Sequence, residues 1–248
     1  MDGILSVKGL SKSYERAGHR INAVENVSFE LRSGEILGVV GSSGSGKSTL
    51  LRLICGLEKP DAGHIYFDGR ALSPERSISD KREMQMIFQD PAASFHPRRT
   101  IQSSIGDAFF SLMGRGAELD LDTLCLEVGL SPELAQHYPR SLSGGQCQRF
   151  AIARAIVSSP RVLLCDEITS ALDVSSQAQI LTLLSSLRKE KGVSMIFVSH
   201  DLAVVSTLCD RVIVMQSGAV VEEGKTEDII SAPQNEYTKE LIASVMEI

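Results

Sequence analysis

The chain has 248 residues, of which 43% are hydrophobic, and this is enough for a large buried core. Its formal net charge of −6 disfavours a protein whose affinity depends on nucleic-acid phosphates, so we expect no nucleic acid as a partner. The five cysteines include no C-x-x-C pair, which disfavours a zinc site and a disulfide framework. Since no apolar stretch approaches about 18 residues, we expect any membrane-spanning part on other chains.

Two kinds of sheet are predicted along the chain. Apolar and polar residues alternate over 4–40, as at Val27 and Phe29. This period-two pattern, with the segment 63–69, predicts an antiparallel sheet. Short continuous apolar runs predict a second, parallel sheet that is buried on both faces. Its expected strands are Ile36–Val40, Met84–Phe88, Val162–Cys165, Val193–Val198 and Arg211–Met215.

The sequence becomes helical in character between residues 90 and 160. Helices are expected at Ile101–Leu112, at Leu121–Val128 and from Ser143 to Pro160. A further helix at Ile180–Lys189, a hairpin at 216–218 and a C-terminal helix complete the predicted elements.

These elements predict an α/β fold in a single domain over residues 1–248. The core comprises residues 1–89 and 161–248, and residues 90–160 form an inserted α-helical subdomain. The core carries the antiparallel sheet as a β subdomain.

A glycine-rich loop lies between the expected strand at Ile36–Val40 and an apolar helix. Its glycines allow consecutive backbone N–H groups to turn toward one point, and the helix N-terminus adds partial positive charge. Lys47 has the length to reach the outer phosphates of a nucleotide, and Ser48 has the hydroxyl expected to bind Mg²⁺. The residues of this predicted phosphate site are Gly41, Ser42, Ser43, Gly44, Ser45, Gly46, Lys47, Ser48 and Thr49.

Two carboxylates and a histidine follow neighbouring predicted strands. Asp166 and Glu167 end the strand that begins at Val162, where open α/β sheets present ligand-binding groups. Asp166 is expected to hold Mg²⁺, and Glu167 to accept a proton from an attacking water. His200, after the next strand, is expected to sense a γ-phosphate through a hydrogen bond.

A second candidate anion site opens the helix after Ser143. Ser143 is a good N-cap, and Gly144 and Gly145 expose backbone N–H groups before Gln146. This segment has no lysine and no preceding apolar strand, so by itself it holds no nucleotide. The economical arrangement is a head-to-tail pair of subunits, in which each helix end closes over the nucleotide of its partner.

Several motifs, which occur in the family's order, resemble those of the ATPase subunits of ABC transporters over nearly the whole chain. Gly41–Thr49 resembles the Walker A loop, Ser143–Gln146 the signature motif, and Asp166 with Glu167 the Walker B pair. The remaining similar positions are Tyr14 (stacking on adenine), Gln89 (Q-loop, reaching Mg²⁺ and the attacking water), Asp173 (D-loop) and His200 (switch histidine).

The resemblance implies a RecA-like P-loop NTPase core and an ATPase that uses ATP and Mg²⁺. It implies a homodimer, or a heterodimer with a paralogous ATPase subunit, bound to two transmembrane permease subunits. An extracytoplasmic solute-binding protein would act with this complex indirectly. The expected location is peripheral, on the cytoplasmic face of the bacterial inner membrane.

The segment 88–100 and the run Tyr237-Thr238-Lys239 resemble ATPases of peptide and nickel importers. Longer members of that group continue beyond this run, so the chain resembles their shorter partner subunits. We therefore expect import of small peptides, nickel or metal complexes. The alternative is an ABC exporter or a lipoprotein-release ATPase. A DNA-repair ATPase of the same superfamily needs a long coiled coil between Gln89 and Ser143, and no sustained heptads occur there.

Overall fold

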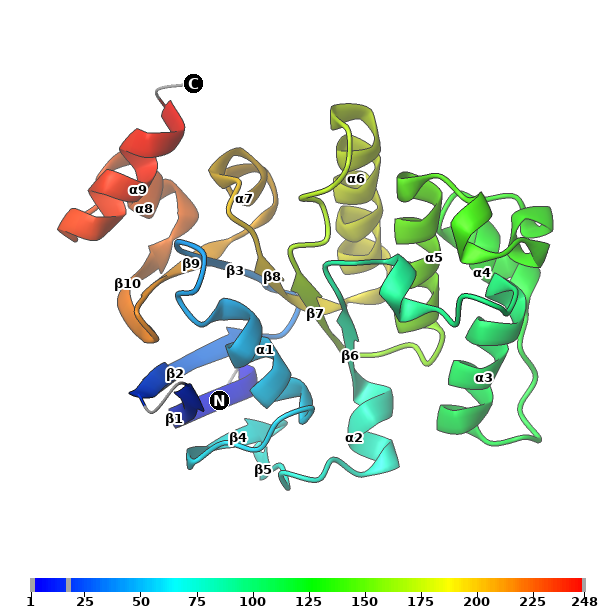
Figure 1. Cartoon of the computed structure of the whole chain (residues 1–248), viewed down its shortest axis with the longest axis horizontal. Coiled ribbons are helices and arrows are strands. Elements are labelled where there is room, and N and C mark those ends of the chain that lie inside the picture. The colour runs from blue at the N-terminus through cyan, green and yellow to red at the C-terminus, as the bar shows by residue number, and fades with distance from the viewer. Residues whose placement is uncertain (1–2, 17–18, 247–248) are drawn as a thin grey trace.

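The computed structural model describes residues 3–16 and 19–246 (Figure 1). Its N-terminal part forms the predicted antiparallel sheet. The strands in order across this sheet are β2 (His19–Arg32), β1 (Gly3–Arg16), β4 (Ala62–Phe67) and β5 (Arg70–Ala71). Every pairing in it is antiparallel. One face of β2 is buried through Val27, Phe29 and Leu31, which confirms the period-two interpretation of this stretch. The alternation is interrupted before Val27 by a shift in the register with β1.

A six-stranded sheet forms the centre of the molecule. Its order is β10 (Ala219–Lys225), β9 (Arg211–Gln216), β3 (Ile36–Val40), β8 (Ser194–Val198), β7 (Val162–Asp166) and β6 (Met84–Ile87). The five predicted strands are all present within one residue of their expected ends and run parallel. Strand β10 joins them as an antiparallel edge after the predicted hairpin at 216–218.

The parallel sheet separates two hydrophobic clusters. In β3, Ile36 and Val40 belong to one cluster and Leu37 and Val39 to the other, as alternation along a strand requires. The first cluster joins the sheet to helices α5 (Gly144–Ile156), α6 (Val174–Lys191) and α7 (Leu202–Leu208). The second joins it to α1 (Lys47–Cys55) and to the antiparallel sheet. Strand β3 is thus buried on both faces.

Every regular element between residues 92 and 156 is helical. These elements are η1 (Ala92–Ser94), α3 (Ile101–Met113), α4 (Leu121–Glu127), η2 (Pro132–Gln136), η3 (Pro139–Ser141) and α5. They lie together at one end of the molecule, in green in Figure 1. The division of the chain into a core and an inserted helical subdomain stays a prediction.

Three short helices were not predicted from the sequence. They are α2 (Ile78–Glu83), α7 and α8 (Thr226–Ser231). The first two are held by local caps, because Ser77 accepts a hydrogen bond from the Asp80 N–H and Asp201 accepts from the N–H groups of Ala203 and Val204. The predicted C-terminal helix is α9 (Glu236–Met246). The predicted helix at Ile180–Lys189 is longer than expected, because α6 starts at Val174.

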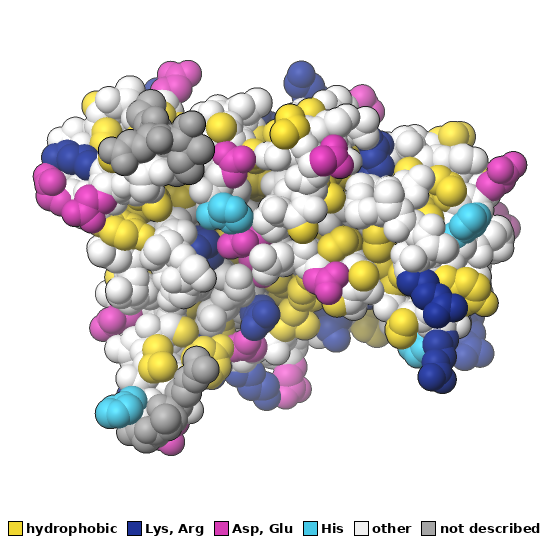
Figure 2. All heavy atoms as spheres, turned by 45° about the horizontal axis from the view of Figure 1, so that its top comes forward, with side chains coloured by type: hydrophobic (Ala, Val, Ile, Leu, Met, Phe, Trp, Pro, Cys, Tyr) yellow, Lys and Arg dark blue, Asp and Glu magenta, His cyan; other side chains and the backbone are white. Residues whose placement is uncertain are grey.

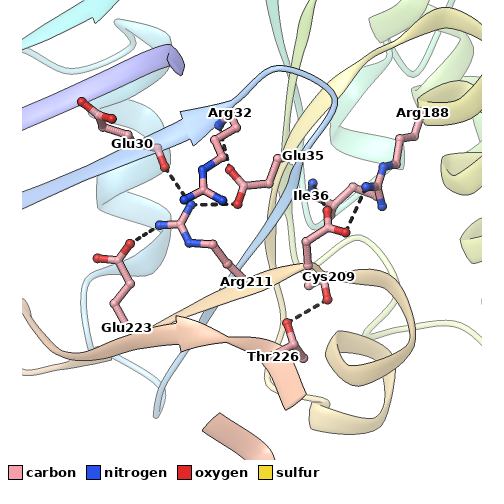
Figure 3. Close-up of polar contacts among 10 residues, drawn as sticks. Glu30, Arg32, Glu35, Ile36, Arg188, Cys209, Arg211, Glu223 and Thr226 are labelled. Atoms are coloured by element: carbon pink, nitrogen blue, oxygen red, sulfur yellow. Dashed lines mark hydrogen bonds and ion pairs between the residues drawn. The ribbon is translucent and has the colours of Figure 1, made fainter. Parts of the chain in front are cut away.

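A cluster of charged residues, here called the polar joint, lies where β3 and β9 begin (Figure 3). Arg211 donates to Glu35 Oε1 at 2.8 Å and also pairs with Glu223. Asp210 accepts from the Ile36 N–H and from Arg188 Nη2, both at 2.9 Å. Because Glu35 is only 6% exposed, its charge depends on Arg211 for compensation.

Among the described residues, no helix combines the length and the hydrophobicity needed to cross a bilayer. On the face drawn in Figure 2, Lys and Arg side chains are interspersed with Asp and Glu, and hydrophobic side chains are scattered among them. This mixed surface agrees with the modest net charge of −6.

Candidate nucleotide site

The glycine-rich loop occupies the turn between β3 and α1, as the sequence predicts. At two positions the space allows only glycine. A Cβ on Gly46 would lie 2.0 Å from the Ala23 carbonyl oxygen, and one on Gly41 would lie 2.2 Å from the Met215 carbonyl oxygen. Both residues also have positive φ, of 103° and 151°. The loop therefore packs directly against the backbones of β2 and β9.

A cavity of about 500 Å³ opens over this loop. Its lining brings together the loop, two residues from other predicted motifs, and parts of β2 and the β9–β10 turn. The lining residues are Ile21, Asn22, Ala23, Ser43, Gly44, Gly46, Lys47, Ser48, Thr49, Gln89, Glu167 and Ser217. The cavity lies at the carboxyl edge of the parallel sheet, where open α/β sheets bind ligands.

Lys47 is buried at the base of the loop. Its ammonium donates to the Gly41 and Ser42 carbonyl oxygens at 2.8 and 2.9 Å. Burial lowers the pKa of this ammonium, although the negative charges of Glu167 and Asp166 oppose that effect. The positive charge is therefore held beside the loop by carbonyl oxygens, which a phosphate oxygen can replace.

Ser48 and Asp166 form a pair suited to Mg²⁺. The Ser48 hydroxyl donates to Asp166 Oδ1 at 2.9 Å, and Asp166 is only 4% exposed. Burial raises the pKa of the Asp166 carboxyl, the Ser48 hydrogen bond opposes this, and the charge of Glu167 adds to it. Mg²⁺ binds such hard oxygen atoms in company with nucleotide phosphates. The donor set present here fits this ion.

Glu167 is contacted by two of the other three predicted catalytic side chains, Gln89 and His200, the third being Lys47. Gln89 Nε2 donates to Glu167 Oε2 at 3.1 Å, and His200 Nδ1 lies 3.4 Å from the same oxygen. The Glu167 backbone has φ of 48°, which is unusual for a residue with a side chain. This left-handed turn directly follows β7 and brings the Glu167 side chain to the cavity. No sequence signal indicated the turn.

The predicted signature segment begins α5. Ser143 Oγ accepts from the Gln146 N–H at 3.2 Å, and Gln146 Oε1 accepts from the Ser143 N–H at 3.0 Å. This reciprocal capping box confirms Ser143 as the N-cap. The segment is not among the described residues that line the cavity. Its role as an anion site therefore stays a prediction.

Tyr14 and Asp173 also lie outside the cavity lining. The Tyr14 hydroxyl donates to Glu58, and Tyr14 pairs across the sheet with Ile21, which does line the cavity. Asp173 caps α6 by accepting from the Ser176 N–H at 2.9 Å. Stacking of Tyr14 on adenine and a nucleotide contact of Asp173 stay predictions.

Sequence reasoning missed the contributions of β2 and of the β9–β10 turn to the cavity. Ile21, Asn22 and Ala23 carry no motif, and only the backbone carbonyl of Ala23 lies close to Gly46 of the loop. Ser217 lies in the predicted hairpin, but nothing in the sequence indicates that the hairpin reaches the loop. The Gly218 N–H donates to the Ser45 carbonyl at 3.0 Å, which brings the turn to the site.

The family match and two of the most similar relatives all concern ATP-binding proteins of transporters. Residues 24–170 match the ABC transporter family. The chain is 43% identical to a Brucella ovis protein named as a peptide import ATP-binding protein, over 98% of this chain and 78% of the relative. It is 44% identical to the oligopeptide transport ATP-binding protein OppF of Escherichia coli, over 91% of this chain and 70% of the relative.

A solved structure with the same fold is a dimer of the ATP-binding cassette MJ0796 in a post-hydrolysis state with ADP and Pi. Its TM-score is 0.80 and its sequence is 30% identical, over 90% of this chain and 98% of that chain. The antiparallel and parallel sheets with their helices are thus the fold of an ATP-binding cassette.

Proposed function

This chain belongs to the ABC transporter family, and we propose that it hydrolyses ATP to power the import of small peptides. The observation that carries the catalytic part is the convergence of Gln89 and His200 on one oxygen of Glu167, beside Lys47 and the Ser48–Asp166 pair. The names of the relatives at 43–44% identity support peptides as cargo and favour an importer over an exporter or a lipoprotein-release ATPase.

Glu167 is the proposed general base. Its carboxylate is one residue beyond the Mg²⁺-binding Asp166, so it accepts a proton from water without being neutralised by the metal. Gln89 orients the carboxylate and the attacking water, and His200 hydrogen-bonds the γ-phosphate. Lys47 exchanges the carbonyls of Gly41 and Ser42 for phosphate oxygens.

When bound, Mg²⁺ would neutralise negative charge on the nucleotide phosphates. Ser48 and Asp166 would hold the ion, and Gln89 would contribute its amide oxygen. The N–H groups of the loop residues Gly41–Thr49 surround the phosphates. Tyr14 stacks on the adenine base, and Asp173 contacts the nucleotide at the dimer interface.

ATPase subunits of such importers work as dimers with membrane permease subunits. Here the proposed dimer is head to tail, so that Ser143, Gly144, Gly145 and Gln146 close over the partner's γ-phosphate. The partner is an identical chain or a paralogue.

The conformational change at the nucleotide site is transmitted to the permease through the segment after Gln89. This segment joins the cavity to α3, so a change at the γ-phosphate is carried into the helical part as a rigid-body rotation. Two transmembrane permease subunits dock there, and a solute-binding protein delivers cargo from the far side. The proposed location is accordingly the cytoplasmic face of the inner membrane.

The test is uptake by a strain that lacks this gene. Uptake of a labelled dipeptide or oligopeptide is expected to fall to background and to return with the wild-type gene, but not with Glu167→Gln. Nickel uptake, with and without a chelator, is measured in parallel. A loss of nickel uptake alone would replace peptide by metal as cargo. Accumulation of a compound inside the cell with normal uptake would establish export instead.

A further inference from the structure

The C-terminal helix makes a direct polar contact with the phosphate loop. The Ser42 backbone N–H donates to the Tyr237 hydroxyl at 2.8 Å, although the two residues are 195 positions apart. Tyr237 lies in the first turn of α9, and its ring packs against the hydrophobic cluster between the parallel sheet and helices α5, α6 and α7. The contact is therefore made by a ring that is itself held in place.

The start of α9 is fixed to the sheet by a chain of hydrogen bonds. Asn235 Oδ1 accepts from the Tyr237 N–H at 2.9 Å, which caps the helix. The Glu222 carboxylate, on β10, accepts from the Gln234 N–H at 2.8 Å and from the Asn235 N–H at 3.2 Å. Burial opposes the charge on Glu222, but these N–H groups, together with Thr238 and the charge of Lys239, lower the pKa of the carboxyl. These hydrogen bonds fix the position of Tyr237 relative to β10.

A second contact holds the loop near its other end. The Gly218 N–H donates to the Ser45 carbonyl at 3.0 Å, and the Gly218 carbonyl accepts from the Glu25 N–H at 2.8 Å. Both of these bonds are between backbone groups and do not depend on side-chain identity. The bond at Ser42 depends on one hydroxyl, so it can be removed without changing the loop sequence.

We propose that Tyr237 is a positioning residue that holds the phosphate loop in its nucleotide-binding conformation. This inference rests on the proposed assignment of Gly41–Thr49 as the phosphate site. A loop released at Ser42 samples other arrangements, in which its N–H groups no longer point to one place. The apparent Kd for ATP then equals the intrinsic Kd divided by the fraction of molecules whose loop is in the binding-competent arrangement, so the apparent affinity falls. By reciprocity, bound nucleotide stabilises the packing of α9.

The experiment compares Tyr237→Phe with Tyr66→Phe in the full chain. Tyr66 lies on β4, its hydroxyl makes no hydrogen bond with a described residue, and the same atom is removed. Loss of one hydrogen bond predicts that Tyr237→Phe raises the Kd for MgATP about threefold to tenfold. The KM for hydrolysis rises by the same factor and kcat stays within about twofold, because Glu167 is untouched. Tyr66→Phe leaves all three constants unchanged.

Lys47→Ala separates the two proposals. If Lys47→Ala does not weaken ATP binding, the assignment of the phosphate site is wrong. If Lys47→Ala weakens binding while Tyr237→Phe matches Tyr66→Phe, the phosphate site stands and the positioning role of Tyr237 is wrong. Hydrogen exchange gives an independent readout. MgATP is expected to slow exchange of the α9 amides in the wild-type chain and to do so less in Tyr237→Phe, and equal slowing in both chains contradicts the coupling.

Discussion

The two edges of the parallel sheet, where its strands begin and where they end, differ in how their charged side chains are paired. Where β3 and β9 begin, the polar joint pairs each buried charge, and Arg211 satisfies Glu35 at 2.8 Å. At the opposite, carboxyl edge of the sheet, Asp166 and Glu167 stand side by side at the end of β7, and Lys47 donates to carbonyl oxygens instead of to either carboxylate. The first end is arranged for stability, and the second keeps charges available for a ligand.

The pKa shifts of half-buried Arg211 and buried Lys47 show this difference. Burial opposes the charge of Arg211, yet the hydrogen bond and charge of Glu35 and the charge of Glu223 outweigh it and raise the pKa. At Lys47 burial outweighs the attraction of Glu167 and Asp166, and the pKa is lowered. The direction of the pKa shift therefore depends on whether the cation is paired directly with a carboxylate. Lys47 lacks a direct carboxylate partner among the described residues, so an added phosphate gains a strong contact there.

The largest effect is expected at the strand ends that form the site. Glu167→Gln should retain MgATP binding and lower the rate of hydrolysis by about 10²-fold or more, because the proposed general base is lost while the proposed phosphate contacts remain. Nucleotide binding and phosphate release, measured on the same preparation, check this. Glu190→Gln, an exposed change on α6, is the matched control. Near-normal turnover by Glu167→Gln would remove Glu167 from this role.

The next effect is expected in the polar joint and concerns stability. Arg211→Ala leaves Glu35 buried without its cation, which should lower the free energy of unfolding by about 3 kcal/mol. Urea unfolding measures this change. Lys59→Ala, which breaks the exposed pair with Glu75, should change stability little. The folded fraction of Arg211→Ala should bind MgATP normally, and a large loss of affinity would contradict the separation of the two ends.

The smallest effect is expected at Gly34, in the turn before β3. Gly34 has φ of 70° and no atom within 4 Å of an added Cβ, so Gly34→Ala carries only backbone strain. Its expected cost is about 1 kcal/mol of stability, with unchanged ATP affinity. Gly46→Ala, at the opposite end, should abolish ATP binding because its Cβ meets the Ala23 carbonyl oxygen. Thermal unfolding and ATP titration of both variants test the contrast, and equal ATP affinities would refute it.

Much of the site was predictable because its residues follow parallel strands. Strands such as β3, β7 and β8 are short apolar runs, and the carboxyl ends of parallel strands lie along one edge. The sequence could therefore place Lys47, Asp166 and Glu167 near one another. The convergence of Gln89 and His200 on one Glu167 oxygen was not predictable at this level, since it depends on side-chain directions after two further turns.

The sequence by itself determined the parallel strands, the glycine-rich turn and the N-cap of α5, because each follows from local periodicity or from a local hydrogen bond. Tertiary structure alone decided which residues pack against the loop. Ala23, Gly218 and Tyr237 carry no local signal for these contacts, because they reach the loop only when β2, the β9–β10 turn and α9 pack around it. It also decided the left-handed backbone of Glu167. That conformation is unfavourable in the isolated chain and persists because the surrounding fold holds it.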